Sequence, residues 1–192
     1  MNRFVNCIAL SVATLVLINA AHAQQEQAKP PTVLDLADGK LQLPIAAAWK
    51  SVKPRSRIIQ HEFSIPSAEG DGQPGRLTIM AAGGGIEANL ARWAGQFRSA
   101  DGKPLADDAK KVEKKTISTL DVHIVDITGS YQDKPRGPFG PSVNRPDYRM
   151  LAAIVVTKNQ GAWFIKSYGP QKTMTAAKPA FNKMIESIVW KP

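Results

Sequence analysis

The stretch that decides the fold covers residues 80–98, MAAGGGIEANLARWAGQFR. A β-type run at residues 76–80 leads into its three consecutive glycines. After the glycines, apolar side chains recur at helical spacings of four, three and four residues: Ile86, Leu90, Trp93 and Phe97. The polar residues of the run, Asn89 and Arg92 among them, fall mostly on the opposite side. The pattern predicts a strand, a glycine turn and an amphipathic helix that lies on a sheet.

Short β-rich segments separated by turn residues make up most of the remaining chain, at 41–44, 57–65, 112–120 and 122–131. Residues 150–156 and 162–165 predict a hairpin that is apolar throughout, which favours a central position in the sheet. A closing segment at 175–189 has helical spacing, with Pro179 in its first turn. Short connections favour antiparallel pairing. We therefore expect an α+β fold, a three-layer α/β/α sandwich with a mostly antiparallel central sheet.

The first 23 residues have the pattern of an export signal. A positive start at Arg3 precedes an apolar core at residues 4–18 and the small-residue site Ala21-His22-Ala23. We expect cleavage after Ala23 and a periplasmic or secreted protein. The single cysteine, Cys7, lies in the signal, so disulfide and thiolate chemistry are excluded from the mature chain.

Beyond the signal, residues 24–40 are polar and prolyl and lack periodicity, which predicts a disordered leader. Residues 41–192 are expected to form one domain. No second long apolar run follows, so the mature chain is not expected to span a membrane.

The chain is basic, with 25 Lys+Arg against 16 Asp+Glu and a formal net charge of +9 at pH 7. The basic residues are spread along the sequence, which indicates a generally positive surface. Such a surface suits an acidic protein or an anionic component of the cell envelope. Nucleic acid is not expected as a partner, because the chain is predicted to be exported and has no recognisable binding motif.

Patterns that could carry chemistry are weak. Gly83, Gly85 and Ala88 fit a loosened dinucleotide motif, but no acidic strand end or phosphate-binding lysine accompanies them, which favours a tight turn with positive φ. His61 with Glu62, and His123 with Asp121 or Asp126, could be drawn as acid–base pairs or metal ligands. However, His61 and Glu62 point to opposite faces of one strand, and so do His123 and the residues that flank it. We expect these side chains to face solvent. No catalytic residue, cofactor or metal is therefore predicted.

The prolyl stretch at residues 133–147, DKPRGPFGPSVNRPD, predicts a long loop. Arginines and an aromatic on a rigid loop are typical of a partner contact, although a hairpin extension packed on the sheet edge fits equally well. Arg92, beside the apolar helix stripe, either covers that stripe or faces a ligand. The predicted partner-binding residues are Lys134, Arg136, Phe139, Arg145 and Arg92.

Several positions together resemble the PsbP-like superfamily, which includes the photosystem II oxygen-evolving extrinsic protein and a Ran guanine-nucleotide release factor. The resemblance rests on Leu43-Pro44 with Trp49, Asn89-Leu90-x-Arg92-Trp93-x-x-Gln96-Phe97, Gly129-x-Tyr131, the hairpin that ends in Gly169-Pro170, and Phe181, Met184 and Ser187 in the closing helix. It implies an α/β/α sandwich of an exported bacterial branch that docks onto other proteins.

The function that we predict is an exported, non-catalytic binding or scaffold domain that docks a protein or an anionic envelope partner. The alternative is an enzyme or a small-molecule carrier whose pocket is not visible in the sequence. A solvent-filled cleft in which Trp93 or Trp163 lies beside His61 or His123 would overturn the binding-scaffold interpretation and indicate a catalyst.

Overall fold

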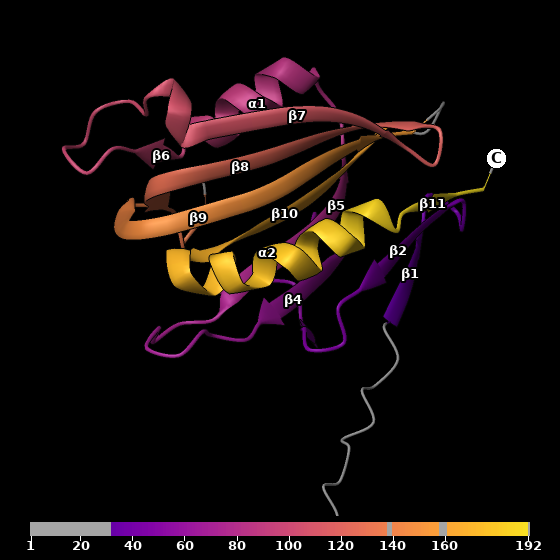
Figure 1. Cartoon of the computed structure of the whole chain (residues 1–192), viewed down its shortest axis with the longest axis horizontal. Helices are drawn as coiled ribbons and strands as arrows, with labels where there is room; N and C mark the ends of the chain where they lie inside the picture. Colours follow the sequence, from indigo (N-terminus) through magenta and orange to yellow (C-terminus); the bar gives the residue numbers. More distant parts are fainter. Residues whose placement is uncertain (1–31, 138–139, 158–160, 192) are drawn as a thin grey trace, which may run out of the picture.

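The computed structural model describes residues 32–137, 140–157 and 161–191 (Figure 1). Its strands are β1 (Thr32–Leu36), β2 (Leu41–Ile45), β3 (Lys50–Val52), β4 (His61–Ile65), β5 (Gly75–Ala82), β6 (Phe97–Arg98), β7 (Lys110–Ile117), β8 (Leu120–Asp133), β9 (Val143–Val156), β10 (Ala162–Pro170) and β11 (Val189–Trp190). The helices are α1 (Ile86–Ala94), the short 3-10 helix η1 (Asp107–Ala109) and α2 (Gln171–Glu186).

Two antiparallel sheets organise these strands. The large sheet has the order β3-β4-β5-β10-β9-β8-β6, and β7 also pairs with β8. A small sheet has the order β1-β2-β11. Every pairing between the strands of the described segments is antiparallel, as expected from the short connections.

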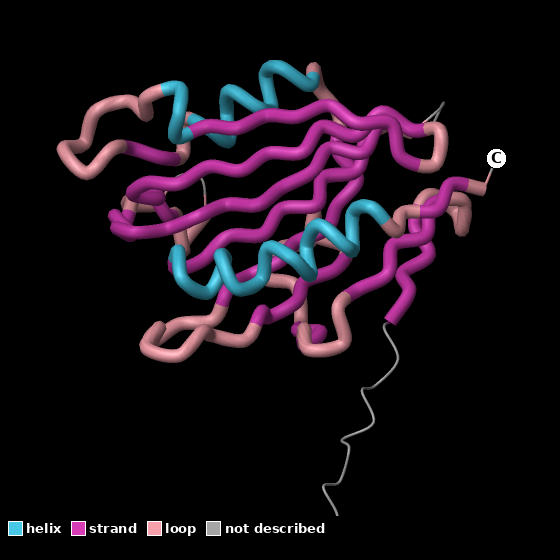
Figure 2. Tube along the Cα trace, in the orientation of Figure 1, coloured by secondary structure: helices cyan, strands magenta, loops and turns pink. Residues whose placement is uncertain are grey.

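The large sheet is covered on both faces, which confirms the predicted three-layer arrangement. On one face, α2 contacts β9 and β10 and contributes Met174, Phe181 and Ile185 to a core that also includes the small sheet. On the other face, α1 places Trp93 in a second core. Figures 1 and 2 show α2 crossing the long strands, with the small sheet beside its C-terminal end.

The hairpin of β9 and β10 lies in the middle of the large sheet, as its continuous apolar sequence predicted. Side chains of β9 alternate between the two cores: Leu151 and Ala153 join the core under α2, while Ala152 and Ile154 join the core under α1.

The glycine turn before α1 has the conformational role that the sequence favoured over a nucleotide site. Gly84 has a φ of 96°, a region that L side chains rarely adopt. The Asn89 side-chain amide donates a hydrogen bond to the Gly85 carbonyl at 3.0 Å and is buried. The expected solvent-facing position of Asn89 is therefore wrong, because its amide ties the turn to the helix.

Both helices differ from their predicted extents. α1 ends at Ala94, where the Gly95 N–H bonds to the Ala91 carbonyl, and Phe97 begins β6 while remaining fully buried in the same core. α2 begins at Gln171, so Pro179 lies inside the helix rather than in its first turn. Pro179 is on the exposed side, where water can satisfy the carbonyl that lacks its usual helical donor.

The folded region starts before the predicted boundary at residue 41. Residues 32–36, assigned to a disordered leader, form β1, which pairs with β2 and buries Leu36. A run of only five residues, in which the adjacent Val33 and Leu34 break the alternation and two prolines precede the run, gave too weak a strand signal. The predicted signal peptide and residues 24–31 lie outside the described residues.

The predicted long loop at 133–147 is also shorter in the structure, because β9 already begins at Val143. Pro146 and Asp147 lie opposite the single residue Ser130, between the pairs Gly129–Tyr148 and Tyr131–Arg145. This is a β-bulge, one of the few places where a sheet accepts proline. The prolines therefore did not exclude a strand here.

Gly129, next to this bulge, allows a close approach between β8 and the chain after β6. Its φ is 151°, and an added Cβ would lie 2.7 Å from the Arg98 carbonyl oxygen and 2.9 Å from Leu105. We expect Gly129→Ala to lower the free energy of unfolding by about 1–3 kcal/mol.

Urea denaturation checks this expectation. Gly83→Ala serves as the control, because an added Cβ there meets nothing within 4 Å and φ is not positive. Its effect should stay within about 0.5 kcal/mol. Equal effects of the two substitutions would contradict the close approach at Gly129.

Candidate functional site

A cavity of about 190 Å³ opens on the face of the large sheet that carries α1. We call it the basic–aromatic pocket. Strands β5, β8 and β10, helix α1 and the chain before β4 line it: Arg76, Thr78, Met80, Tyr131, Phe164, Lys166, Tyr168, Arg92, Trp93, Ile58 and Ile59.

Strand alternation and the shortness of α1 create this pocket. Along β10, Trp163, Ile165 and Ser167 are buried on the α2 side, which leaves Lys166 and Tyr168 on the opposite side. A helix of the length of α1 spans only about 14 Å. Trp93 of α1 packs against Phe164 of β10 and shares a core with residues of β8 and β9. Arg76 and Thr78 of β5, with Lys166 and Tyr168 of β10, bring polar side chains to the same face beside it.

Arg76 is paired with a carboxylate and a phenol within the protein. Its Nε lies 2.7 Å from Oε1 of Glu62 and its Nη2 lies 2.9 Å from Oε2, while Nη1 donates to the Tyr168 hydroxyl at 2.7 Å. Burial opposes ionisation of Glu62, but the Arg76 side chain and the Arg55 N–H outweigh it, so the pKa of Glu62 is lowered. Glu62 is 2% exposed, and its predicted solvent-facing position is wrong.

Aromatic rings surround the inner wall. The ring centre of Tyr131 lies 4.8 Å from that of Tyr168, 5.1 Å from that of Phe97 and 6.1 Å from that of Tyr148. Burial raises the pKa of Tyr131, which therefore stays neutral. This packing gives the pocket a rigid wall, since aromatic side chains have few rotatable bonds.

Lys166 is the unusual group of the pocket. Its Nζ donates a hydrogen bond to Gln96 Oε1 at 2.5 Å and lies 5.4 Å and 5.2 Å from the ring centres of Tyr131 and Tyr168. The ammonium lies deep in the protein, although the residue keeps some solvent contact through the cavity. Burial, followed by the charges of Arg92 and Arg76, lowers the pKa of Lys166 to about 7.

The positive charge at this pocket is not balanced within the described parts of the chain. No carboxylate there forms an ion pair with Lys166 or with Arg92. Arg92 Nη2 donates to Asn89 Oδ1 at 2.7 Å, and the residue is exposed at the pocket mouth. The site can therefore accept an anionic group.

The structure brings only part of the predicted partner-binding set to this pocket. Arg92 lines it, whereas Arg145 is partly buried and pairs with Asp133 at 3.5 Å where β8 meets β9. Lys134 and Arg136 are exposed beyond the end of β8. Phe139 lies outside the described residues. Sequence reasoning missed Lys166, although one lysine inside the apolar run 162–168 was a signal.

Two other acidic candidates have structural partners. Asp126 Oδ2 lies 2.6 Å from Arg149 Nη2 and 2.9 Å from Lys178 Nζ, and these contacts outweigh burial and lower the pKa of Asp126. Its expected solvent-facing position is wrong, because it joins β8 and β9 to α2. Asp121 is half exposed and pairs with Lys114 at 2.8 Å.

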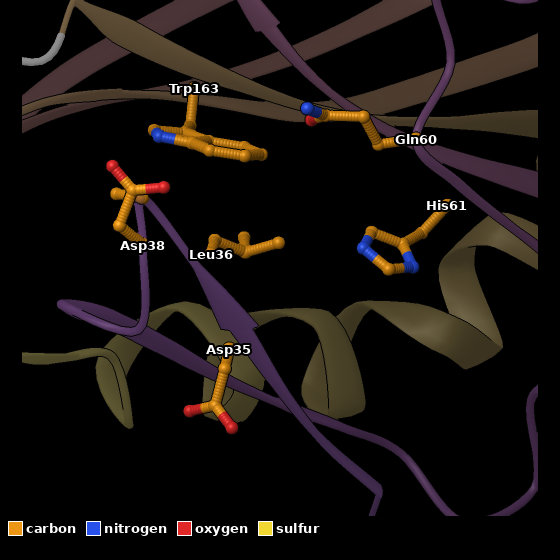
Figure 3. A pocket seen from close by; sticks show the side chains of 7 residues that line it. Asp35, Leu36, Asp38, Gln60, His61 and Trp163 are labelled. Carbon is orange, nitrogen blue, oxygen red and sulfur yellow. The ribbon is translucent and has the colours of Figure 1, made fainter.

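A second cavity, of about 480 Å³, brings His61 and Trp163 together, the arrangement that the sequence associated with a catalyst (Figure 3). Asp35, Asp38 and Gln60 also line it, and Figure 3 shows Asp35 pointing away from His61. The indole N–H of Trp163 is buried and has no hydrogen-bond partner among the described residues.

The chemistry of a catalytic histidine is incomplete at this cavity. Burial lowers the pKa of His61, so its imidazole is neutral at pH 7. Groups of three or more His, Asp or Glu side chains that could hold a metal ion do not occur among the described residues. The cavity provides space, a neutral imidazole and an unpaired donor, but no carboxylate of the described segments is hydrogen-bonded to the imidazole.

The stability of the protein should depend on pH through Lys166. A buried lysine with a pKa near 7 binds fewer protons than the unfolded chain, whose lysines titrate near 10.4, so wild-type stability should rise with pH between these values. Lys166→Met removes this term. Its stability advantage over wild type should shrink by about 2–3 kcal/mol from pH 6 to pH 9.

Urea denaturation across this pH range measures the difference. Lys183→Met removes an exposed lysine from α2 and provides the matched control, which should follow wild type. A pH-independent difference between Lys166→Met and wild type would contradict the enclosed state of the Lys166 ammonium.

No described helix is both long and apolar enough to cross a membrane. Comparison with protein-family models gives no match, and neither does comparison with curated protein sequences. Solved structures do match.

The chain is similar to LpqN of Mycobacterium tuberculosis, described as involved in cell envelope biogenesis, with a TM-score of 0.51 and 13% identity over 84% of this chain and 91% of LpqN. It is also similar to the cyanobacterial PsbP protein CyanoP of Synechocystis, with a TM-score of 0.50 and 9% identity over 84% of this chain and 93% of CyanoP. At this level of identity the likeness concerns the fold. The chain has the PsbP-like fold.

Proposed function

We propose that the protein is an exported, non-catalytic binding domain of the cell envelope that docks an acidic protein partner through the face carrying α1. The observation that carries this proposal is the unbalanced positive charge of Lys166 and Arg92 at the basic–aromatic pocket. Unpaired cations at a partly buried site are stabilised when an anionic partner arrives.

The size and composition of the pocket favour a protein contact. Pockets for drug-sized ligands usually have volumes of about 300–1,000 Å³, and this one holds about 190 Å³. Arginine is enriched among interface hot spots, and Arg92 is exposed at this pocket, with the buried rings of Trp93 and Tyr131 behind it. Ile58, at the rim, is 68% exposed and offers an apolar contact beside the charges. A single anchoring side chain suits this space.

Export and an envelope location rest on the signal-peptide pattern of residues 1–23. The description of LpqN as an envelope-biogenesis protein supports the same location, because the two chains share a fold. Arg145, Lys134 and Arg136 extend the positive surface at the end of the β8–β9 hairpin, and we include them with Phe139 as a second contact region.

A second candidate function belongs to the cavity of His61 and Trp163. Its volume of about 480 Å³ lies in the range of small-molecule sites, and the buried indole N–H of Trp163 is a donor without a partner. These features favour a carrier or an enzyme for a small ligand. The missing acid beside His61 makes general-base catalysis the weaker of the two functions.

Partner recovery tests the docking function. The tagged full-length chain is expressed in cells of its source organism and cross-linked there to its partners. The amount of partner recovered with the tagged chain is then compared between wild type and Arg92→Ala. Loss of one uncompensated charge at an interface centre should reduce recovery about fivefold to tenfold. The triple variant Lys134→Ala/Arg136→Ala/Arg145→Ala measures the second contact region separately.

Lys183→Ala is the matched control, since it removes one exposed positive charge from α2 on the opposite face. His61→Ala tests the other cavity and should leave recovery unchanged. If Arg92→Ala recovers as much partner as Lys183→Ala, docking through the face carrying α1 is refuted.

A further inference from the structure

We propose that the basic–aromatic pocket binds the carboxylate of one acidic side chain, Glu or Asp, from the protein partner, with Lys166 as the ion-pairing group inside and Arg92 at the mouth. This inference rests on the proposed docking function and specifies what enters the site. Three features of the pocket support it: the hydrogen-bond donors that its side chains have left, the apolar residues that line it, and the charged groups around Lys166.

The available donors single out Lys166. Arg76 donates to both oxygens of Glu62 and to the Tyr168 hydroxyl, and its charge is already neutralised by the Glu62 carboxylate, so it attracts a further anion less than Lys166 does. The Thr78 hydroxyl donates to the Lys166 carbonyl at 3.2 Å. An ammonium has three N–H donors, and Gln96 accepts one of them. Two donors of Lys166 therefore remain for an incoming acceptor.

The walls select a carboxylate on an apolar stem. Trp93, Phe164 and Met80 line the space with apolar surface between the charged groups. A phosphate has oxygens on all sides and would leave several of them against these walls without a donor. A chain-terminal carboxylate would bring its adjoining peptide group into the same apolar surroundings. The methylenes of Glu or Asp need no such partners.

The charges around Lys166 also favour a single anion. Arg92 on α1 and Arg76 on β5 repel its proton, while Asp133 at the end of β8 attracts it only weakly. The phenols of Tyr131 and Tyr168 are its other titratable neighbours, and Glu62 is neutralised by Arg76. A bound carboxylate favours the protonated ammonium, so binding should weaken as the pH rises above about 7.

A titration with small probes tests the site on the full mature chain. N-acetyl-glutamic acid amide carries the proposed side-chain carboxylate, and N-acetyl-glutamine amide is its neutral isostere. N-acetyl-alanine presents a chain-terminal carboxylate, and inorganic phosphate presents a phosphate. NMR spectra of the isotope-labelled protein follow the Trp93 indole N–H and the Lys166 side chain during each titration.

We expect the glutamic acid probe to shift both signals with a dissociation constant on the order of a millimolar, as for one anchoring contact. The glutamine isostere should bind at least about tenfold more weakly, and binding should weaken from pH 6 to pH 8. Lys166→Met should abolish the shift at Trp93, whereas the Lys183→Met control should retain it. The spectra themselves report whether each variant is folded.

Several results would overturn the inference. Equal binding of the glutamine isostere would remove the charge requirement, and undiminished binding to Lys166→Met would remove the role of Lys166. Binding of only N-acetyl-alanine or only phosphate would assign the site to a different anion.

The two proposals can fail separately. If no probe binds while Arg92→Ala still reduces partner recovery, docking stands and the carboxylate site is wrong. If the glutamic acid probe binds at Lys166 while Arg92→Ala leaves recovery unchanged, the carboxylate site stands and docking through this face is wrong.

Discussion

The central position of β10 is the constraint on which the rest of the structure depends. Neighbours β5 and β9 bond to both of its edges, so its side chains can leave the sheet only toward one face or the other. One set, with Trp163 and Ile165, enters the core under α2. The other set, Phe164, Lys166 and Tyr168, lines the basic–aromatic pocket beside Arg92 and Trp93 of α1. Strand alternation along β10 thus brings a lysine and a tyrosine to this pocket.

Charge balance divides the polar groups of this face into two kinds. Arg76 and Glu62 neutralise one another and hold β4 to β5, which is what a buried pair must do to offset its desolvation. Within the part of the chain that the structure describes, the acceptors of Lys166 and Arg92 are the neutral amides of Gln96 and Asn89. Burial against the rings of Tyr131 and Tyr168 makes the unpaired ammonium less stable than it would be in water. An anion bound beside this ammonium would therefore offset part of the free-energy cost of its burial.

Where sequence reasoning erred, tertiary pairing overrode a local signal. Proline argued against a strand at residues 143–147, but the bulge opposite Ser130 accepts Pro146. Helical spacing assigned Phe97 to α1, yet Gly95 ends the helix, and Phe97 reaches the same core from β6. Strand alternation correctly placed His61 and Glu62 on opposite faces. It could not reveal that Arg76, on the neighbouring strand, forms an ion pair with Glu62.

The sequence by itself determined the α+β class, the antiparallel pairing and the central hairpin, because periodicity and connection length are local properties. It also identified Arg92 as a residue beside the apolar stripe. Only the tertiary structure decided that Arg76, Arg92 and Lys166 meet around one cavity, and that His61 meets Trp163 at another. These residues come from different strands and helices. Their proximity depends on strand order and on how far α1 reaches over the sheet, which no local pattern encodes.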